Sequence, residues 1–248
     1  MTVKLLIRAL AAGLRNESRF LLEQKWGIRK TRDPFNIPKY ILKRYLPSDP
    51  VIIDCGAHIG ADSIELARVF PNGSIHCFEP VPHIFDKLKK NTATYKNIYC
   101  YQQALGTKNG KSIMFVSSGS SDASSSLLQP TGHKIDHPDV LFNNEIEVST
   151  VSLDSWAYEH NIAGVDFLWL DMQGFEYQML KESKLILPTV KAIHTEVSTR
   201  EVYENSILYT DLKDWMVQNG FEELIKAIPE KADMGNVLFV KTPGNINK

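Results

Sequence analysis

The chain has 248 residues with a formal net charge of −1, and 43% of them are hydrophobic. This length can bury one large core, and so small a charge gives no general attraction to nucleic acid or to an anionic membrane. No run of eighteen apolar residues occurs, so no segment is predicted to span a bilayer. The three cysteines lie in or beside predicted core strands without CxxC spacing. They indicate reduced thiols in a cytoplasmic protein rather than a zinc site.

Residues 1–49 are predicted to form an N-terminal helical extension and a connector. Apolar and basic side chains recur at helical spacing over residues 1–25. The apolar face of this helix has three alternative partners: the main domain, a second subunit in a homodimer, or a membrane surface contacted peripherally. Four prolines mark residues 29–50 as the connector, with a short helix predicted over 38–45.

Residues 51–70, VIIDCGAHIGADSIELARVF, carry the clearest motif of the chain. A short β-branched run predicts a strand buried on both faces. The loop that follows contains Asp54, Gly56 and Gly60, and apolar residues then recur at helical spacing. This order of strand, glycine loop and helix places a nucleotide-like ligand over a helix N-terminus. Gly56 lets the backbone turn and approach that ligand closely.

The next predicted strand, over 74–78, delivers Glu79 immediately before Pro80. A carboxylate at this point can accept hydrogen bonds from both ribose hydroxyls of a nucleotide. The glycine loop lacks the middle glycine that is typical of dinucleotide sites. Asp54 in this loop would repel a pyrophosphate, but it can face the amino group of S-adenosylmethionine. The motif therefore favours S-adenosylmethionine over NAD as the ligand.

The remaining elements alternate as they do in a single α/β sheet. Helices are predicted over 82–91, from Gly174 onward and over 209–219, and strands are predicted over 98–105, 166–170, 190–194, 221–228 and 237–241. Gln103 and Ala104, at the end of the third strand, would lie beside an adenine in such a fold. The last two strands are predicted to form an antiparallel hairpin, which NAD-type sheets usually lack.

An insertion separates the third and fourth core strands of the main domain, which spans residues 50–248. Residues 112–116 and 146–151 alternate between apolar and polar side chains and predict an antiparallel pair. The loop insertion between them, 117–144, is rich in serine and glycine. Two interpretations of this loop stay open: a disordered surface segment, or a lid that covers the acceptor.

Several motifs resemble, in order, the motif series of the FkbM-type methyltransferases. They are DCGAHIG at 54–60, FEP at 78–80, ALG at 104–106, LDSW at 153–156 and LDMQGFE at 170–176. The resemblance implies the Rossmann-like class I methyltransferase fold, with a mostly parallel seven-stranded sheet and a closing antiparallel hairpin. It also implies S-adenosylmethionine-dependent methylation of a hydroxyl group on a sugar, glycan or secondary metabolite. Within these motifs it adds Ala57, His58, Gly60 and Pro80 to the cofactor-binding residues.

The chain departs from the family pattern at three of these positions. His58 stands where many members have asparagine, Trp169 where they have lysine, and Gln173 where they have glutamate. The donor-binding residues are little affected by these departures. No catalytic role is inferred from the resemblance at these three positions.

Two consecutive parallel strands are predicted to deliver carboxylates to the edge where open α/β sheets bind ligands. Asp171 follows the fourth core strand, and Glu196 follows the fifth. Methyl transfer to an alcohol needs a base for the hydroxyl proton. Asp171, which would also border the donor, is the first candidate and Glu196 the second, followed by His194 and Glu176. Alternatively, Asp171 and Glu196 could hold a divalent metal that acidifies the hydroxyl, although no ligand spacing defines a metal site.

Two other classes of protein remain as alternatives. The first is a NAD-linked Rossmann oxidoreductase, which the loop chemistry and the closing hairpin disfavour. The second is a non-catalytic protein that binds the donor and uses its sheet or its basic helix for interaction. The presence of both the glycine loop and the paired acids argues against this second class.

Overall fold

The computed structural model describes residues 35–230 and 232–242, so the helix predicted over 1–25 lies outside the described residues. The described residues form a seven-stranded sheet in the order β3-β2-β1-β7-β8-β10-β9, with β10 antiparallel to β8 and β9. Its strands are β1 (Val51–Cys55), β2 (Ser74–Phe78), β3 (Ile98–Tyr101), β7 (Phe167–Leu170), β8 (Ala192–Ser198), β9 (Phe221–Ala227) and β10 (Met234–Lys241). The predicted parallel sheet with its closing hairpin is confirmed.

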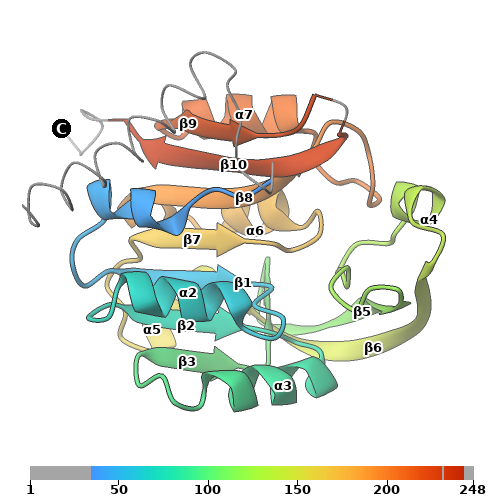
Figure 1. Cartoon of the computed structure of the whole chain (residues 1–248), viewed down its shortest axis with the longest axis horizontal. Coiled ribbons are helices and arrows are strands. Elements are labelled where there is room, and N and C mark those ends of the chain that lie inside the picture. Colours follow the sequence, from blue (N-terminus) through green and yellow to red (C-terminus); the bar gives the residue numbers. More distant parts are fainter. Residues whose placement is uncertain (1–34, 231, 243–248) are drawn as a thin grey trace, which may run out of the picture.

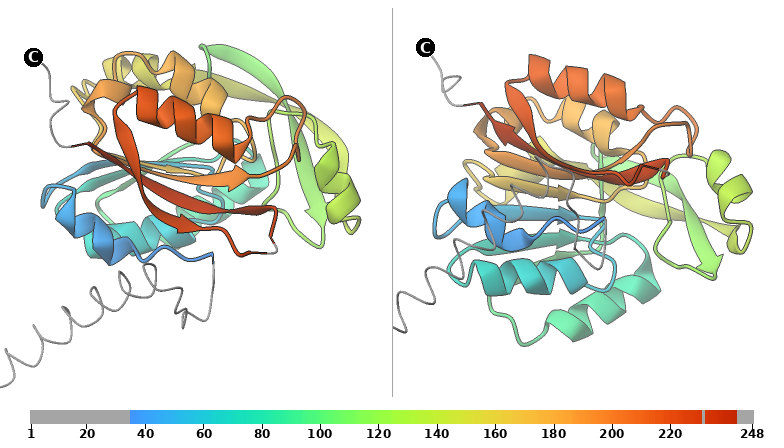
Figure 2. Two further views of the ribbon diagram at one scale, coloured as in Figure 1. Left: turned by 90° about the horizontal axis from the view of Figure 1, so that it is seen from above. Right: turned by 45° about the horizontal axis from the view of Figure 1, so that its top comes forward.

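Helices cover both faces of this sheet (Figure 1 and Figure 2). On one face lie η1 (Lys39–Arg44), α2 (Ala61–Val69) and α3 (Pro82–Thr92), and on the other lie α5 (Leu153–Glu159), α6 (Glu176–Glu182), η2 (Leu187–Thr189) and α7 (Tyr209–Gln218). The first face buries Leu66 and Leu88 against the strands. The second buries Trp156 and Met179. None of these described helices is long and apolar enough to cross a membrane.

Strand β1 lies inside the sheet, between β2 and β7, and its side chains suit burial on both faces. Ile52 and Ile53 are fully buried, and β1 pairs in parallel with β2 on one side and with β7 on the other. Gly60, with φ of 86°, ends the following loop and begins α2. Pro82 occupies the first turn of α3, where a proline costs no hydrogen bond. These elements fix the loop after β1 at the carboxyl edge of the sheet.

The prediction of one strand over 98–105 is wrong, because the chain leaves the main sheet after Tyr101. Partner strand β2 ends at Phe78, which pairs with Tyr101, so the ladder has no further partner residues. After a bend, strand β4 (Ala104–Gly106) pairs instead with Thr150 to Ser152 in a second sheet. Gln103 therefore lies in a link between two sheets rather than at a strand end.

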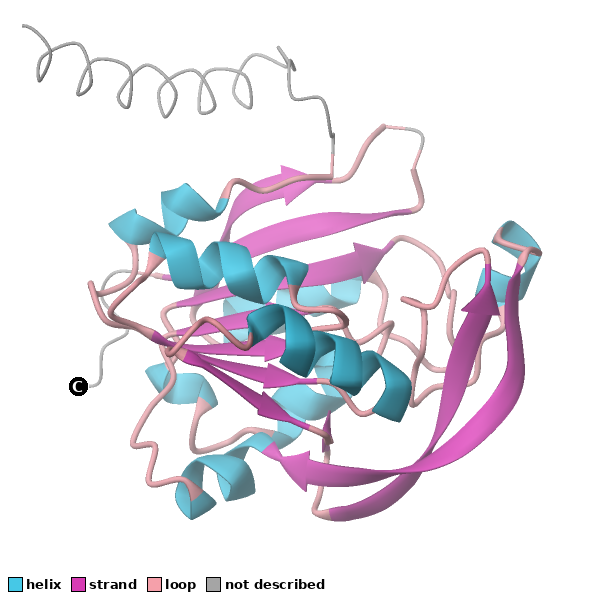
Figure 3. Ribbon diagram, turned by 60° about the horizontal axis from the view of Figure 1, so that its bottom comes forward, coloured by secondary structure: helices cyan, strands magenta, loops and turns pink. Residues whose placement is uncertain are grey.

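The insertion is more ordered in secondary structure than predicted. Strands β5 (Gly110–Gly119) and β6 (Val140–Ser152) pair in antiparallel fashion, and α4 (Gly132–Asp136) lies between them. Both strands extend into the predicted loop insertion, where Gly119 still pairs with Val140. The prediction missed these ends because burial there does not alternate with residue type: Ser117 and Val140 are buried, whereas Leu141 is exposed. Figure 3 shows this hairpin reaching away from the main sheet.

Candidate active site

The loop after β1 approaches the end of β7 too closely for any side chain at Gly56. Gly56 has φ of 81°, and a Cβ atom there would overlap the carbonyl oxygen of Asp171. The backbone N–H of Asp171 donates to the carbonyl of Cys55 at 3.0 Å, which keeps the two strand ends together. Since glycine tolerates this conformation and has no Cβ, the sequence motif has a direct structural cause.

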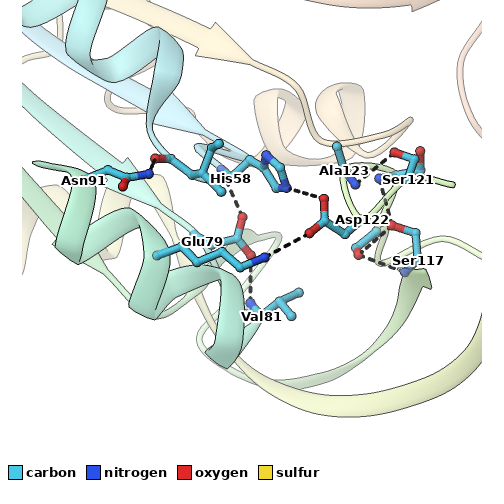
Figure 4. Close-up of polar contacts among 12 residues, drawn as sticks. His58, Glu79, Val81, Asn91, Ser117, Ser121, Asp122 and Ala123 are labelled. Atoms are coloured by element: carbon cyan, nitrogen blue, oxygen red, sulfur yellow. Dashed lines mark hydrogen bonds and ion pairs between the residues drawn. The ribbon is translucent and has the colours of Figure 1, made fainter. Parts of the chain in front are cut away.

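Glu79 is held by two backbone hydrogen bonds at the end of β2 (Figure 4). One carboxylate oxygen accepts the N–H of His58 at 3.1 Å, and the other accepts the N–H of Val81 at 2.8 Å. Burial raises the pKa of Glu79 to about 7, although both hydrogen bonds act to lower it. Each oxygen keeps a second lone pair. The carboxylate is thus positioned to accept two further donors from one side.

A cavity with about 560 Å³ of space between atoms, part of it open to solvent, lies in front of Glu79. It brings together six of the predicted donor-site residues: Gly56, His58, Glu79, Pro80, Ala104 and Asp171. Asp54, Ala57, Gly60 and Gln103 do not line it. Apolar walls come from residues that the sequence reasoning did not single out: Leu105, Met114, Leu127 and Phe175. The cavity is thus lined by apolar side chains together with the predicted carboxylates Glu79 and Asp171.

Asp54 points away from this cavity and into the protein. It is 1% exposed, and its carboxylate accepts the hydroxyl of Ser63 in α2. Burial raises the pKa of Asp54 to about 7. The described contact ties the end of β1 to the first turns of α2. A direct contact of Asp54 with the donor amino group stays a prediction.

Asp171 and Glu196 are joined through the side-chain amide of Gln173. The Nε2 of Gln173 donates to Asp171 at 2.7 Å and to Glu196 at 2.9 Å. The hydroxyl of Tyr203 donates to the Oε1 of Gln173 at 2.7 Å, which fixes the amide orientation. Burial raises the pKa of both carboxyls. The predicted meeting of the two acids at the sheet edge therefore occurs through a third residue.

Glu196 and Glu176 face a second cavity rather than the first. This cavity, of about 390 Å³, lies beyond Gly174 and is also lined by Tyr203 and Ser206. One oxygen of Glu176 accepts the N–H of Met172 at 2.8 Å, so this carboxylate stabilises the turn before α6. Burial raises the pKa of Glu176 to about 7. Asp171 is thus the one candidate base of the sequence analysis that lines the first cavity.

His194 lies in a stack of aromatic and cationic side chains. Its ring lies parallel to that of Trp169 with centroids 3.6 Å apart, and the Nζ of Lys39 lies 4.4 Å from the Trp169 centroid. Burial lowers the pKa of His194 to about 3. His194 lines neither cavity, so the contacts around it are those of a packed core side chain.

Cavity residues from the insertion were missed by the sequence reasoning. Asp122, Ala123, Ser125 and Leu127 all contribute to the wall of the first cavity. One feature of the sequence could have indicated Asp122: it is the one charged side chain between residues 117 and 130. Within the described residues, no group of three or more His, Cys, Asp or Glu side chains could hold a metal ion.

The sheet order and the glycine loop after β1 together define an α/β fold of the class I methyltransferase type. The sequence profile described as "Methyltransferase FkbM domain" matches residues 54–223. The chain belongs to this family of methyltransferases, and its cofactor is S-adenosylmethionine. This membership confirms the resemblance stated above and sets aside the NAD-linked alternative.

Three known proteins are among those that resemble the chain. The 2-O-methyltransferase NoeI of Sinorhizobium fredii is 29% identical over 221 residues, which cover 87% of this chain and 89% of the relative. An rRNA methylase from Streptococcus thermophilus has a TM-score of 0.50 at 11% identity, covering 86% of this chain and 99% of that structure. A methyltransferase FkbM from Methylobacillus flagellatus has a TM-score of 0.49 at 15% identity, covering 83% and 48%. The rRNA methylase shows a likeness of fold alone.

Proposed function

We propose that the protein transfers the methyl group of S-adenosylmethionine to a hydroxyl group of a sugar, glycan or secondary metabolite. The observation that carries this proposal is the position of Asp171, a half-buried carboxylate in the cavity wall beside Gly56. The similarity to a relative named as a 2-O-methyltransferase supports oxygen as the acceptor atom. Nothing in this assignment depends on the identity of the acceptor molecule.

The donor would occupy the first cavity in a defined orientation. Glu79 would accept the two ribose hydroxyls through its remaining lone pairs. Ala104 would lie beside the adenine, with Met114, Leu127 and Phe175 supplying apolar contacts from the cavity wall. Gly56 allows the backbone to approach the methionine portion without a side chain. The bound donor supplies an activated methyl group.

Asp171 would take the hydroxyl proton of the acceptor as the new C–O bond forms. Burial raises the pKa of Asp171 toward neutral pH. A general base is most effective when its pKa lies near the pH at which the enzyme works. Gln173 keeps the carboxylate in one orientation through its 2.7 Å hydrogen bond. Gln173 also donates to Glu196 at 2.9 Å, so Glu196 is the acid joined to Asp171 through one residue. Glu196 is accordingly the second residue to test.

Binding and turnover measurements test this proposal directly. Calorimetric titration is expected to show binding of S-adenosylmethionine and none of NAD. Incubation with labelled S-adenosylmethionine and a panel of glycosides and oligosaccharides should then transfer label to an acceptor oxygen. Donor binding without transfer to any acceptor of this panel would favour the non-catalytic donor-binding alternative. Absence of donor binding would contradict the proposal as a whole.

A further inference from the structure

Residues 117–130 form a segment, here called the strap, that folds over the donor cavity. Asp122, Ser125 and Leu127 of the strap share the cavity wall with Glu79 and Gly56. The sequence analysis left a disordered segment and an acceptor lid as alternatives for this region. The contacts place the strap against the predicted donor site instead.

One end of the strap is attached through buried contacts. Ser126 is fully buried, and its hydroxyl donates to the carbonyl of Gln173 at 2.8 Å. Ser126 also exchanges two backbone hydrogen bonds with Phe115 of β5, at 2.8 and 3.1 Å. Buried hydrogen bonds of this kind are costly to break, since each leaves an unsatisfied polar group. This end of the strap is therefore expected to stay in place when the donor enters or leaves.

The tip of the strap, at Asp122, is attached through a hydrogen bond with His58 and an ion pair with Lys87 (Figure 4). Next to the tip, the N–H of Ser124 donates to the Oγ of Ser117 at 2.9 Å, and the hydroxyl of Tyr203 donates to the carbonyl of Ser124 at 3.0 Å. One carboxylate oxygen of Asp122 lies 2.9 Å from the Nε2 of His58, and the other lies 3.3 Å from the Nζ of Lys87 in α3. The three side chains are 41%, 30% and 52% exposed, respectively. Ion pairs this exposed contribute little to stability, roughly 0–1 kcal/mol each. They can therefore break and re-form rapidly.

The attachment at Asp122 leads directly to the predicted donor-binding residues. His58 belongs to the glycine loop, and its N–H donates to the Glu79 carboxylate. Asn91 of α3 holds the same loop by donating to the carbonyl of Ile59 at 2.9 Å. Because Asp122 is the one charged side chain of the strap, no second ion pair can replace its contacts. Asp122 therefore supplies the charged contact that holds the strap tip, alongside the two hydrogen bonds of Ser124.

We propose that Asp122 is the releasable end of a strap that retains S-adenosylmethionine, and the demethylated product S-adenosylhomocysteine, in the cavity. When the contacts of Asp122 and the adjacent hydrogen bonds of Ser124 break, the tip moves off the cavity while Ser126 stays attached, and the donor can exchange. Asp122 is thus a positioning residue that acts through His58 and Lys87. The inference rests on the proposed function for the identity of the ligand and adds the step that controls ligand exchange.

The test measures the release of labelled S-adenosylmethionine into an excess of unlabelled compound by rapid filtration. Lys87→Met removes one of the two ion pairs without altering the glycine loop, and release should become about 2- to 5-fold faster. Asp122→Ala removes both, and release should become about 3- to 30-fold faster. The double variant Lys87→Met/Asp122→Ala should release the compound no faster than Asp122→Ala. The reason is that Asp122→Ala alone already removes the carboxylate that Lys87 contacts.

A matched control comes from the same inserted hairpin. Lys111 forms a 2.6 Å ion pair with Glu147 outside the strap, and neither residue lines the cavity. Lys111→Met should leave the release rate unchanged. Raised salt should accelerate release from the wild-type protein but not from Asp122→Ala, because screening weakens exposed ion pairs. A purely structural role of Asp122 would not produce this salt response.

The outcomes separate this inference from the proposed function. If the wild-type protein binds S-adenosylmethionine but both variants release it at the wild-type rate, the donor assignment stands and the strap assignment fails. The same conclusion follows if Lys111→Met accelerates release as much as Lys87→Met. If the wild-type protein binds no S-adenosylmethionine, the proposed function itself fails.

Discussion

Glu79 is oriented by the backbone before any donor is bound, which makes it the clearest residue for a test of donor recognition. Glu79→Ala removes both acceptor oxygens and should weaken S-adenosylmethionine binding by roughly 1.5–3 kcal/mol, the range for hydrogen bonds to a charged group. Calorimetric titration measures the change. Circular dichroism shows whether the variant is folded, and a folded variant with wild-type affinity would remove Glu79 from the donor site.

Asp171 is the residue at which the chemical step can be tested. Asp171→Asn keeps the shape of the side chain and removes its charge, so kcat should fall roughly 10²- to 10⁴-fold, the usual contribution of a general base. The donor affinity and the melting temperature should barely change. Steady-state kinetics on an accepted substrate provides the measurement. Turnover within a few-fold of the wild type would identify Asp171 as a structural residue and direct attention to Glu196.

The loop between β1 and α2 is the element whose backbone geometry is most constrained. Gly56→Ala places a Cβ atom on the carbonyl oxygen of Asp171 and adds the strain of a positive φ, about 1–3 kcal/mol. The melting temperature should fall, and the affinity for S-adenosylmethionine should drop at least about tenfold. Differential scanning fluorimetry and titration measure the two effects.

Gly110 provides the control for this substitution. It also has a positive φ, of 146°, but a Cβ atom there would meet nothing within 4 Å. Gly110→Ala should therefore carry strain without overlap and leave donor binding intact. Equal losses of stability in the two variants, with donor binding retained in both, would show that the close approach at Gly56 is unimportant.

Prediction from sequence succeeded for elements whose determinants are local. A β-branched run, a glycine loop and helical spacing lie within residues 51–70, and these features define β1, the loop and α2 without knowledge of the partners. Prediction failed where the end of a strand is determined by the strand with which it pairs. The break after Tyr101 depends on where β2 ends, and the outer ends of β5 and β6 depend on each other. Secondary structure set by distant pairing leaves no local pattern.

The same distinction applies to the candidate site. Glu79 and Asp171 could be predicted because each follows an apolar strand that fixes its position at the sheet edge. Asp122 could not, since only the fold brings this loop residue against His58. Gln173 was noted as a departure from a family pattern, but its bridging of two acids depends on side-chain geometry. Contacts between loops are decided by the tertiary structure rather than by spacing.

At the scale of the whole molecule, the buried acids make stability depend on pH. Burial raises the pKa values of Asp54, Glu79 and Glu176 to about 7. The native state therefore retains protons that the unfolded chain has already lost between about pH 4.5 and pH 7. The stabilisation from these groups is present below this window and is lost as the pH rises through it. Each group contributes on the order of 3–4 kcal/mol at most.

Glu176→Gln isolates one of these contributions in the donor-free protein. The amide can still accept the N–H of Met172, but it does not titrate. His76 and His194, with pKa values lowered to about 4 and about 3, act in the opposite direction below pH 6.5. Because both histidines are present in both proteins, they cancel in the difference. Urea denaturation should show the variant losing up to about 3 kcal/mol less than the wild type between pH 5 and pH 8. Parallel curves would contradict the assignment.

The inserted hairpin has a consequence for how the two halves of the sheet join. Strands β1 and β7 are neighbours, yet the hydrogen bond from Val51 to Asp166 spans 115 residues of chain. Strands β5 and β6 pair along a continuous hairpin, and β4 then lies in parallel beside the last residues of β6. Once this local structure has formed, Gly106 is already next to Ser152. The effective length of the loop that must close is shortened, and the entropic cost of bringing β7 to β1 falls accordingly.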